Sequence, residues 1–125
     1  MGYRSDVAAA FYVNKPDDFP MLKLWLDENF PTSDWEQNIR WFSKGMLVEC
    51  DSVKWYDGYP DVQAFEAAAD KFIELCNNEL NVEDVPKFNY EFIRIGEDYD
   101  DVDVVREGAR CEYLLEVQRS ISVEV

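Results

Sequence analysis

The chain has 125 residues and a formal net charge of −15, from 27 acidic and 12 basic side chains. Hydrophobic residues make up 47% of it and aromatic residues 15%, which excludes a disordered protein and predicts a single folded domain over residues 1–125. The charge excludes the basic surface that nucleic-acid binding needs, and it favours attraction to basic proteins over anionic membranes.

The first half of the chain predicts a strand, a helix and two further strands. Residues 4–13 place apolar side chains at alternate positions, which is typical of a strand. In residues 17–29 apolar side chains recur at helical spacing, and either Asp17 or Asp18 can cap this helix. Residues 38–55 predict two strands joined by a short glycine-containing loop.

The second half predicts a long helix and two more strands. Residues 60–79 carry an apolar stripe at helical spacing. Apolar side chains alternate from Phe88 to Phe92, and again over residues 111–123, where the opposite side is polar. The order β-α-β-β-α-β-β predicts an α+β fold. We expect a two-layer, ferredoxin-like sandwich, in which a mainly antiparallel sheet carries both helices on one face and solvent on the other.

The segment GEDYDDVD, residues 96–103, holds five carboxylates in eight positions. A calcium loop of the EF-hand type needs oxygen ligands, a glycine and a final glutamate at fixed positions, and no register of this segment supplies them. We therefore expect neither a metal site nor a cofactor. A looser magnesium or calcium site and a well-solvated connector are the alternatives for this segment taken alone.

Few catalytic arrangements are open to this chain. It has no histidine, which excludes Ser-His and Cys-His pairs and Cys/His zinc sites. Its five glycines lie too far apart for a phosphate-binding loop, and no pair of its carboxylates is distinguished from the rest. Cys50, Cys76 and Cys111 include no CxxC pair, fall in apolar patterns and suit a reducing compartment. We therefore expect no enzymatic activity.

Part of the charge is arranged within the predicted elements. On the second helix carboxylates recur every four residues opposite the apolar stripe, at a spacing similar to that of phosphates along a DNA strand. Trp and Tyr side chains flanked by acids are typical of protein interfaces. The alternatives are a solvated helix face and partial burial of the rings. The candidate partner-binding residues are Glu66, Asp70, Glu74, Glu97, Asp98, Tyr99, Asp100, Asp101, Asp103 and Trp55.

Four stretches of the chain resemble one group of known proteins. They are MGYRSDV at the start, VKWYDGYPDV at residues 53–62, FNYEFIRIGEDYDDVD at residues 88–103 and YLLEVQRSISV near the end. Together they are similar, nearly end to end, to a family of small proteins of bacteriophages and prophages. The resemblance brings no catalytic or ligand residues with it. It implies an accessory protein of a virus that infects bacteria.

These observations lead to the hypothesis of a small acidic phage-type binding protein in the cytoplasm of a bacterial host. It would inhibit a basic host protein of defence or nucleic-acid handling, such as a CRISPR effector or a restriction enzyme, partly by imitating the charge of nucleic acid. We expect no direct binding to nucleic acid or membranes, and either a monomer or a homodimer. The alternatives are an immunity protein against a basic nuclease toxin, a structural or regulatory phage module, and a metal-dependent enzyme that uses the carboxylates of residues 97–103.

Overall fold

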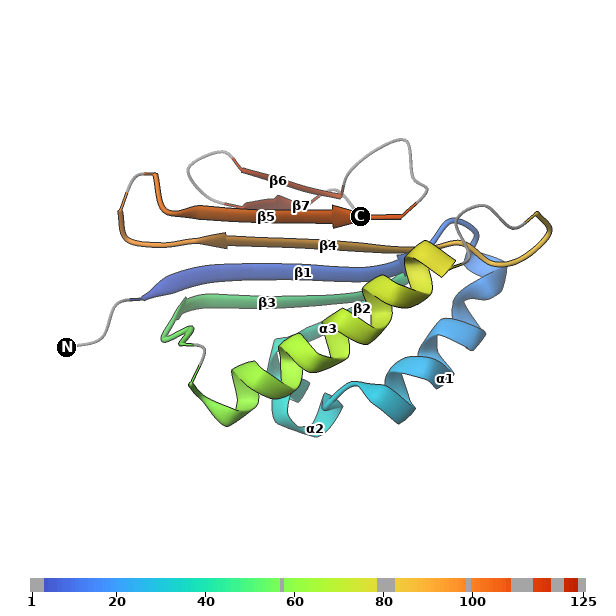
Figure 1. Ribbon diagram of the computed structural model, residues 1–125, viewed down its shortest axis with the longest axis horizontal. Coiled ribbons are helices and arrows are strands. Elements are labelled where there is room, and N and C mark those ends of the chain that lie inside the picture. The colour runs from blue at the N-terminus through green and yellow to red at the C-terminus, as the bar shows by residue number, and fades with distance from the viewer. Residues whose placement is uncertain are drawn as a thin grey trace.

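A five-stranded antiparallel sheet forms the centre of the molecule (Figure 1). The computed structural model describes residues 4–56, 58–78, 83–98, 100–108, 114–117 and 121–123. The strands of the sheet are β1 (Ser5–Val13), β2 (Ile39–Phe42), β3 (Gly45–Val53), β4 (Phe88–Ile95) and β5 (Val102–Glu107). Their order is β2-β3-β1-β4-β5, and every neighbouring pair is antiparallel. The fold is therefore of the mixed α+β class.

Three α-helices lie along one side of this sheet (Figure 1). They are α1 (Phe19–Asn29), the single turn α2 (Thr32–Trp35) and α3 (Pro60–Asn78), with 3-10 turns at Pro16–Asp18 and Glu36–Asn38. α1 packs against β1 and β3, whereas α3 packs against β4 and β5. The sequence did not predict α2, because four residues are too few to show helical periodicity. Among the described helices, none is long and apolar enough to cross a membrane.

Aromatic rings fill the space between the helices and the sheet. The Phe11 ring, from the central strand β1, lies 5.3 Å from the Phe30 ring and 5.1 Å from the Phe72 ring, and it is fully buried. Phe65 of α3 contacts the rings of Phe11 and Phe30 in edge-to-face geometry. Such pairs add to the stabilisation that burial of the rings provides. This cluster fixes α3 over the sheet and so positions the exposed side of the helix.

The opposite face of the sheet is also covered, contrary to the prediction of a solvated face. Strands β6 (Leu115–Val117) and β7 (Ile121–Val123) pair with each other and pack over β1 and β4. A second apolar cluster forms here around the fully buried Leu115. Its sheet residues are Ala8, Ala10, Tyr12, Leu47 and Ile93. The small side chains of Ala8 and Ala10 leave room for this second layer over the sheet.

The buried Glu91 of β4 binds this second layer to the sheet. Its carboxylate is fully buried and accepts a hydrogen bond from the Tyr12 hydroxyl. It also accepts the backbone N–H groups of Leu114 and Leu115, each at 3.0 Å. The guanidinium of Arg106 lies 4.0 Å away and donates to the Leu115 carbonyl at 2.7 Å. A buried carboxylate needs such partners, so this network specifies where the second layer docks.

In the last third of the chain one prediction is wrong and one strand was not predicted. A single strand was predicted over residues 111–123, but within its described part Leu115 pairs with Val123 and Val117 pairs with Ile121. Apolar alternation continues through a reversal of the chain, so the pattern could not reveal it. The edge strand β5 was not predicted, because it begins inside the acidic segment and two adjacent valines interrupt its alternation.

Candidate functional site: an acidic groove beside α3

α3 presents a row of exposed carboxylates. Pro60 begins the helix, and the Asp61 carboxylate accepts the Val62 N–H at 2.9 Å in its first turn. The buried stripe of the helix faces the sheet, which leaves the predicted acidic positions on the opposite side. Glu66, Asp70 and Glu74 are all exposed. Within the described residues, neither Asp70 nor Glu74 forms an ion pair.

A groove runs between α3 and the β4–β5 edge of the sheet. Its larger cavity, about 390 Å³, is lined by Trp55, Glu66, Phe92, Arg94, Asp101 and Asp103 together with Tyr56. A smaller cavity of about 180 Å³ shares Glu66 and Phe92 and adds Asp70, Ile73, Tyr90 and Val105 among its walls. We call these two adjoining cavities the acidic groove. It brings together five of the predicted residues: Trp55, Glu66, Asp70, Asp101 and Asp103.

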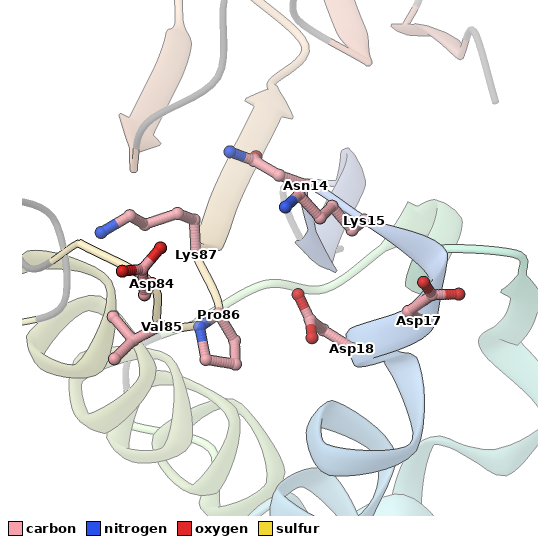
Figure 2. Close-up of a pocket in the computed structure, with 8 residues that line it drawn as sticks. All are labelled: Asn14, Lys15, Asp17, Asp18, Asp84, Val85, Pro86 and Lys87. Carbon is pink, nitrogen blue, oxygen red and sulfur yellow. The ribbon is translucent and has the colours of Figure 1, made fainter.

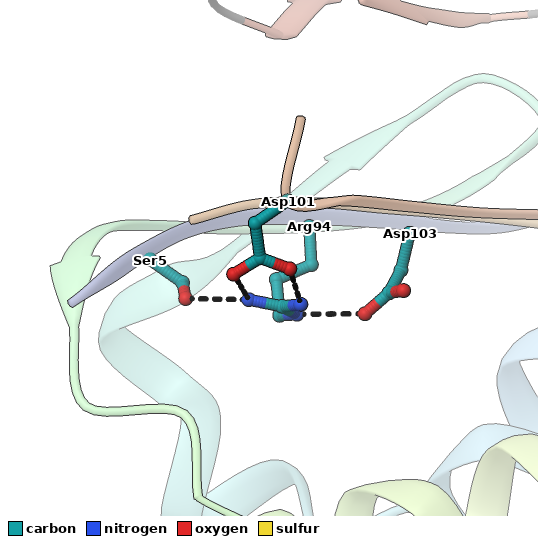
Figure 3. Close-up of polar contacts among 4 residues, drawn as sticks. All are labelled: Ser5, Arg94, Asp101 and Asp103. Atoms are coloured by element: carbon teal, nitrogen blue, oxygen red, sulfur yellow. Dashed lines mark hydrogen bonds and ion pairs between the residues drawn. The ribbon is translucent and has the colours of Figure 1, made fainter. Parts of the chain in front are cut away.

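Arg94 holds the two aspartates of the groove in place (Figure 3). Its guanidinium donates to both oxygens of Asp101, at 2.6 and 3.2 Å, and to Asp103 at 2.8 Å. It also donates to the buried Ser5 hydroxyl at 3.0 Å. The hydrogen bonds that the guanidinium donates to Asp101, and then the one to Asp103, raise the pKa of Arg94 above its ordinary value. One cation therefore serves two carboxylates, and the cluster keeps a net negative charge.

The phenol of Tyr90 lies at the smaller cavity, where nearby carboxylates create a negative potential. Burial raises the pKa of its phenol far above the usual value, and the charges of Asp70 and then Glu66 raise it further. The phenol therefore stays protonated across the physiological pH range. It remains a hydrogen-bond donor on the wall of the groove and is not a base.

Trp55 forms an apolar wall of the larger cavity. Its ring is half-buried and lies 5.6 Å from Trp35, 5.3 Å from Phe65 and 6.0 Å from Phe92. These contacts attach it to the aromatic core. It therefore presents one fixed surface to the groove, which suits an interface anchor better than a mobile exposed ring.

The remaining predicted residues lie outside the groove lining or outside the described chain. Glu97, Asp98 and Asp100 are exposed on the turn between β4 and β5, where the Glu97 carboxylate accepts the Arg4 N–H at 3.1 Å. Glu74 continues the α3 row but lines neither cavity. Tyr99 is not among the described residues. The predicted acidic loop is thus a hairpin turn whose last two carboxylates point to Arg94.

Sequence reasoning missed Arg94, Tyr90, Phe92 and Val105 as residues of this site. A signal for Arg94 was present, since it alternates with Phe88, Tyr90 and Phe92 on the packed side of a strand. A cation on an apolar face directly before an acidic run indicates a local ion pair. Val105 carried no comparable signal, because its position depends on the pairing of β4 with β5.

The described residues offer little for metal or thiol chemistry. They contain no group of three or more His, Cys, Asp or Glu side chains that could hold a metal ion. Cys50 and Cys76 are buried free thiols. Burial, followed by the charges of Asp51, Asp61 and Glu49, raises the pKa of the Cys50 thiol to about 11. Cys50 is therefore a thiol and not a nucleophilic thiolate at neutral pH.

Another cavity, of about 490 Å³, lies outside the acidic groove, where β1 ends and β4 begins (Figure 2). Lys15 and Lys87 line it together with Asp17, Asp18 and Asp84. Charges of both signs therefore meet there, whereas the groove beside α3 holds four carboxylates and one arginine. Compared with this cavity, the acidic groove is the better match to a basic partner.

Comparison with known proteins adds no relative. No family model, no curated protein and no solved structure matches the chain.

Proposed function

We propose that this protein is a non-enzymatic inhibitor that binds a basic surface of a nucleic-acid-binding protein. The observation that carries the proposal is the exposed row of Glu66, Asp70 and Glu74 on α3, beside the acidic groove. Carboxylates four residues apart on a helix lie about 6 Å from one another, which allows them to meet lysines and arginines that otherwise contact successive phosphates. Trp55 and Phe92 supply apolar surface next to this row.

The partner that suits this surface is a bacterial protein of defence or nucleic-acid handling. The net charge of −15 attracts basic proteins and accelerates their encounter with this one at low salt. We propose an infected bacterium as the setting of that encounter, because four stretches of the sequence resemble bacteriophage proteins. A CRISPR effector or a restriction enzyme fits both conditions. A basic nuclease toxin would need the same surface on an immunity protein, so the identity of the partner distinguishes the two roles.

The test uses the tagged protein to capture partners from a bacterial lysate. Each captured protein is then purified, and its affinity for labelled DNA or RNA is measured by fluorescence anisotropy with increasing amounts of the acidic protein. We expect direct competition that weakens as salt is raised. The combined variant Glu66→Gln, Asp70→Asn, Glu74→Gln should compete at least about ten-fold less well, which corresponds to about 1.4 kcal/mol of binding free energy.

A matched control removes three exposed charges elsewhere. Glu28→Gln, Asp34→Asn and Glu36→Gln neutralise exposed positions on α1, on α2 and directly after it. This variant has the same net charge as the α3 variant and should compete like the parent protein. Equal losses in both variants would mean that only net charge matters. A partner that retains its nucleic acid at saturation would contradict the proposal.

The proposed fold relationship is to the ferredoxin-like group. The order β2-β3-β1-β4, with all pairs antiparallel and with α1 and α3 on one side, supports it. In that relationship β5 and the β6–β7 pair are additions to the common arrangement. β5 forms one wall of the acidic groove through Val105 and Asp103, so the addition completes a site whose other walls are formed by α3, β4 and the segment of Trp55.

A further inference from the structure

Among the described strands, β5 lies at one edge of the five-stranded sheet. It is the last strand in the order β2-β3-β1-β4-β5, so on its outer side no described strand pairs with it. Its register with β4 is regular from Val102 to Glu107, without a bulge. It contains neither lysine nor proline, two residues that commonly protect an edge strand. Val104 and Val105 are 43% and 36% exposed.

The pairing shows which backbone groups of β5 point outward. At the turn, the Gly96 N–H donates to the Asp101 carbonyl at 2.8 Å, so this pair is hydrogen-bonded across the hairpin. Hydrogen-bonded pairs alternate with non-bonded ones in an antiparallel ladder. Asp103 and Val105 therefore bond to β4, whereas Val102 and Val104 point away from it. The Val102 N–H already bonds to the Asp100 carbonyl at 3.1 Å, which leaves Val104 as the centre of the open edge.

The two faces of β5 differ in charge. Asp103 and Val105 lie opposite Arg94 and Phe92, on the helix side, and both line the acidic groove. Val104 lies opposite Ile93, on the side of the β6–β7 pair. A strand added beyond β5 would therefore place alternate side chains next to the carboxylates of the groove, and the others next to Val104.

We propose that β5 binds an extended basic segment of the partner protein as a sixth, antiparallel strand. This inference rests on the proposed function and specifies how the partner is held. Charge selects the occupant: lysine or arginine at every second position would face Asp103, Asp70 and Glu66, with small β-branched residues between them. A second copy of this chain is a poor occupant, because two molecules of net charge −15 repel each other.

A peptide of alternating lysine and threonine, with the intact parent protein, tests the pairing by calorimetry. In the antiparallel register the residues beside Val104 direct their N–H groups toward β5, and these are the threonines if the lysines face the groove. N-methylation of the threonines should therefore weaken binding at least about ten-fold, since it removes edge hydrogen bonds and adds a clash. N-methylation of the lysines leaves charge and composition equal and should change affinity less than about two-fold.

A pair of protein variants tests the same edge from the other side. Val104→Pro removes an N–H group that points away from β4, and edge strands tolerate proline at such positions. This variant should bind the peptide about ten-fold more weakly. Val104→Ala keeps the N–H and should bind like the parent. Amide NMR signals of Phe92 and Arg94 report whether the β4–β5 ladder survives in both variants. On binding, the Val104 amide of the parent should become protected from hydrogen exchange.

The outcomes separate this inference from the proposed function. Failure of the peptide to bind, or equal binding of both N-methylated peptides, overturns strand addition. If the α3 triple variant loses the peptide while threonine methylation has no effect, the acidic surface stands and strand addition is wrong. If threonine methylation blocks binding and the α3 variant binds normally, strand addition stands and the role of the helix carboxylates is contradicted.

Discussion

The carboxylates of β4 and its hairpin differ from those of α3 in what surrounds them. Glu91 is buried among a hydroxyl, two backbone N–H groups and a guanidinium, and Asp101 accepts hydrogen bonds from two guanidinium nitrogens of Arg94. Asp70 and Glu74 are exposed instead. The same side-chain chemistry thus serves two purposes. The first region uses carboxylates to specify the fold, and the second leaves them available to a partner.

This difference predicts which neutralising substitutions damage the protein and which do not. Where a carboxylate accepts several hydrogen bonds in a buried site, its loss leaves donors without partners and costs free energy of unfolding. Where carboxylates repel one another at the surface, their loss relieves repulsion. The predictions below test this division, from the largest expected effect to the smallest.

Glu91→Gln should cause the largest loss. The amide retains the shape of the side chain but provides a weaker acceptor for Tyr12 and for the Leu114 and Leu115 N–H groups. We expect the free energy of unfolding to fall by about 3 kcal/mol, measured by urea denaturation with circular dichroism. As a control, Glu49→Gln affects a carboxylate whose side chain is 46% exposed in a 3.4 Å pair with Arg40, and should cost less than about 0.5 kcal/mol. Equal losses of stability in Glu91→Gln and Glu49→Gln would contradict the distinction between buried and exposed carboxylates.

The Cys50 thiol extends the comparison to alkaline pH. Its pKa in the folded protein, about 11, lies above the value of 9.0 for an unperturbed thiol. A raised pKa means that the stabilisation is complete below pH 9 and is lost as the pH rises through about 11. The two-unit difference sets an upper bound of about 3 kcal/mol on this stabilisation. Between pH 8 and pH 11 the free energy of unfolding, measured by urea denaturation, should fall less in Cys50→Ala than in the parent protein. The difference between the two losses should not exceed this bound. Equal losses in both proteins would contradict a raised pKa of the Cys50 thiol.

Arg94 and Asp101 should be coupled. Their side chains are 15% and 32% exposed, and two hydrogen bonds join them. A double-mutant cycle with Arg94→Gln and Asp101→Asn should give a coupling energy of about 1.5 kcal/mol, because the bonds are charge-assisted and partly buried. The cycle for Lys23 and Asp27 on α1, an exposed pair at 3.0 Å, should give only about 0.4 kcal/mol. A coupling at Arg94 no larger than this would mean that the guanidinium does not organise the hairpin.

Sequence reasoning succeeded where a pattern is contained within one element. The helices predicted over residues 17–29 and 60–79 correspond to α1 and α3, and their apolar stripes identified the sides that pack on the sheet. Predicting the exposure of Asp70 and Glu74 needed only the opposite side of the same stripe. The acidity of one wall of the groove was thus accessible from the sequence.

Sequence reasoning failed where the structure depends on pairing between distant segments of the chain. β5 is defined by its register with β4, and the burial of Glu91 depends on β6 packing above it. Neither relation leaves a periodic signal within its own strand. The position of Arg94 on the packed side of its strand was visible in the sequence, but its pairing with Asp101 and Asp103 depends on the turn that returns these aspartates to it. The wall of the groove that β4 and β5 form could therefore be identified only from the structure.

Neutralising the α3 row should give the smallest effect, and one of opposite sign. In Glu66→Gln, Asp70→Asn, Glu74→Gln two repulsive pairs at four-residue spacing are removed, each worth a few tenths of a kcal/mol. The free energy of unfolding should therefore rise by about 0.5 kcal/mol at low salt. Sodium chloride screens the same repulsion over a Debye length of about 10 Å at 0.1 M, so the melting temperature of the parent should rise with salt, and that of the variant should rise less. The control variant at Glu28, Asp34 and Glu36 lacks the four-residue stack and should follow the parent more closely. A loss of stability in the α3 variant would mean that these carboxylates support the fold as Glu91 does, and the distinction between the two regions would not hold.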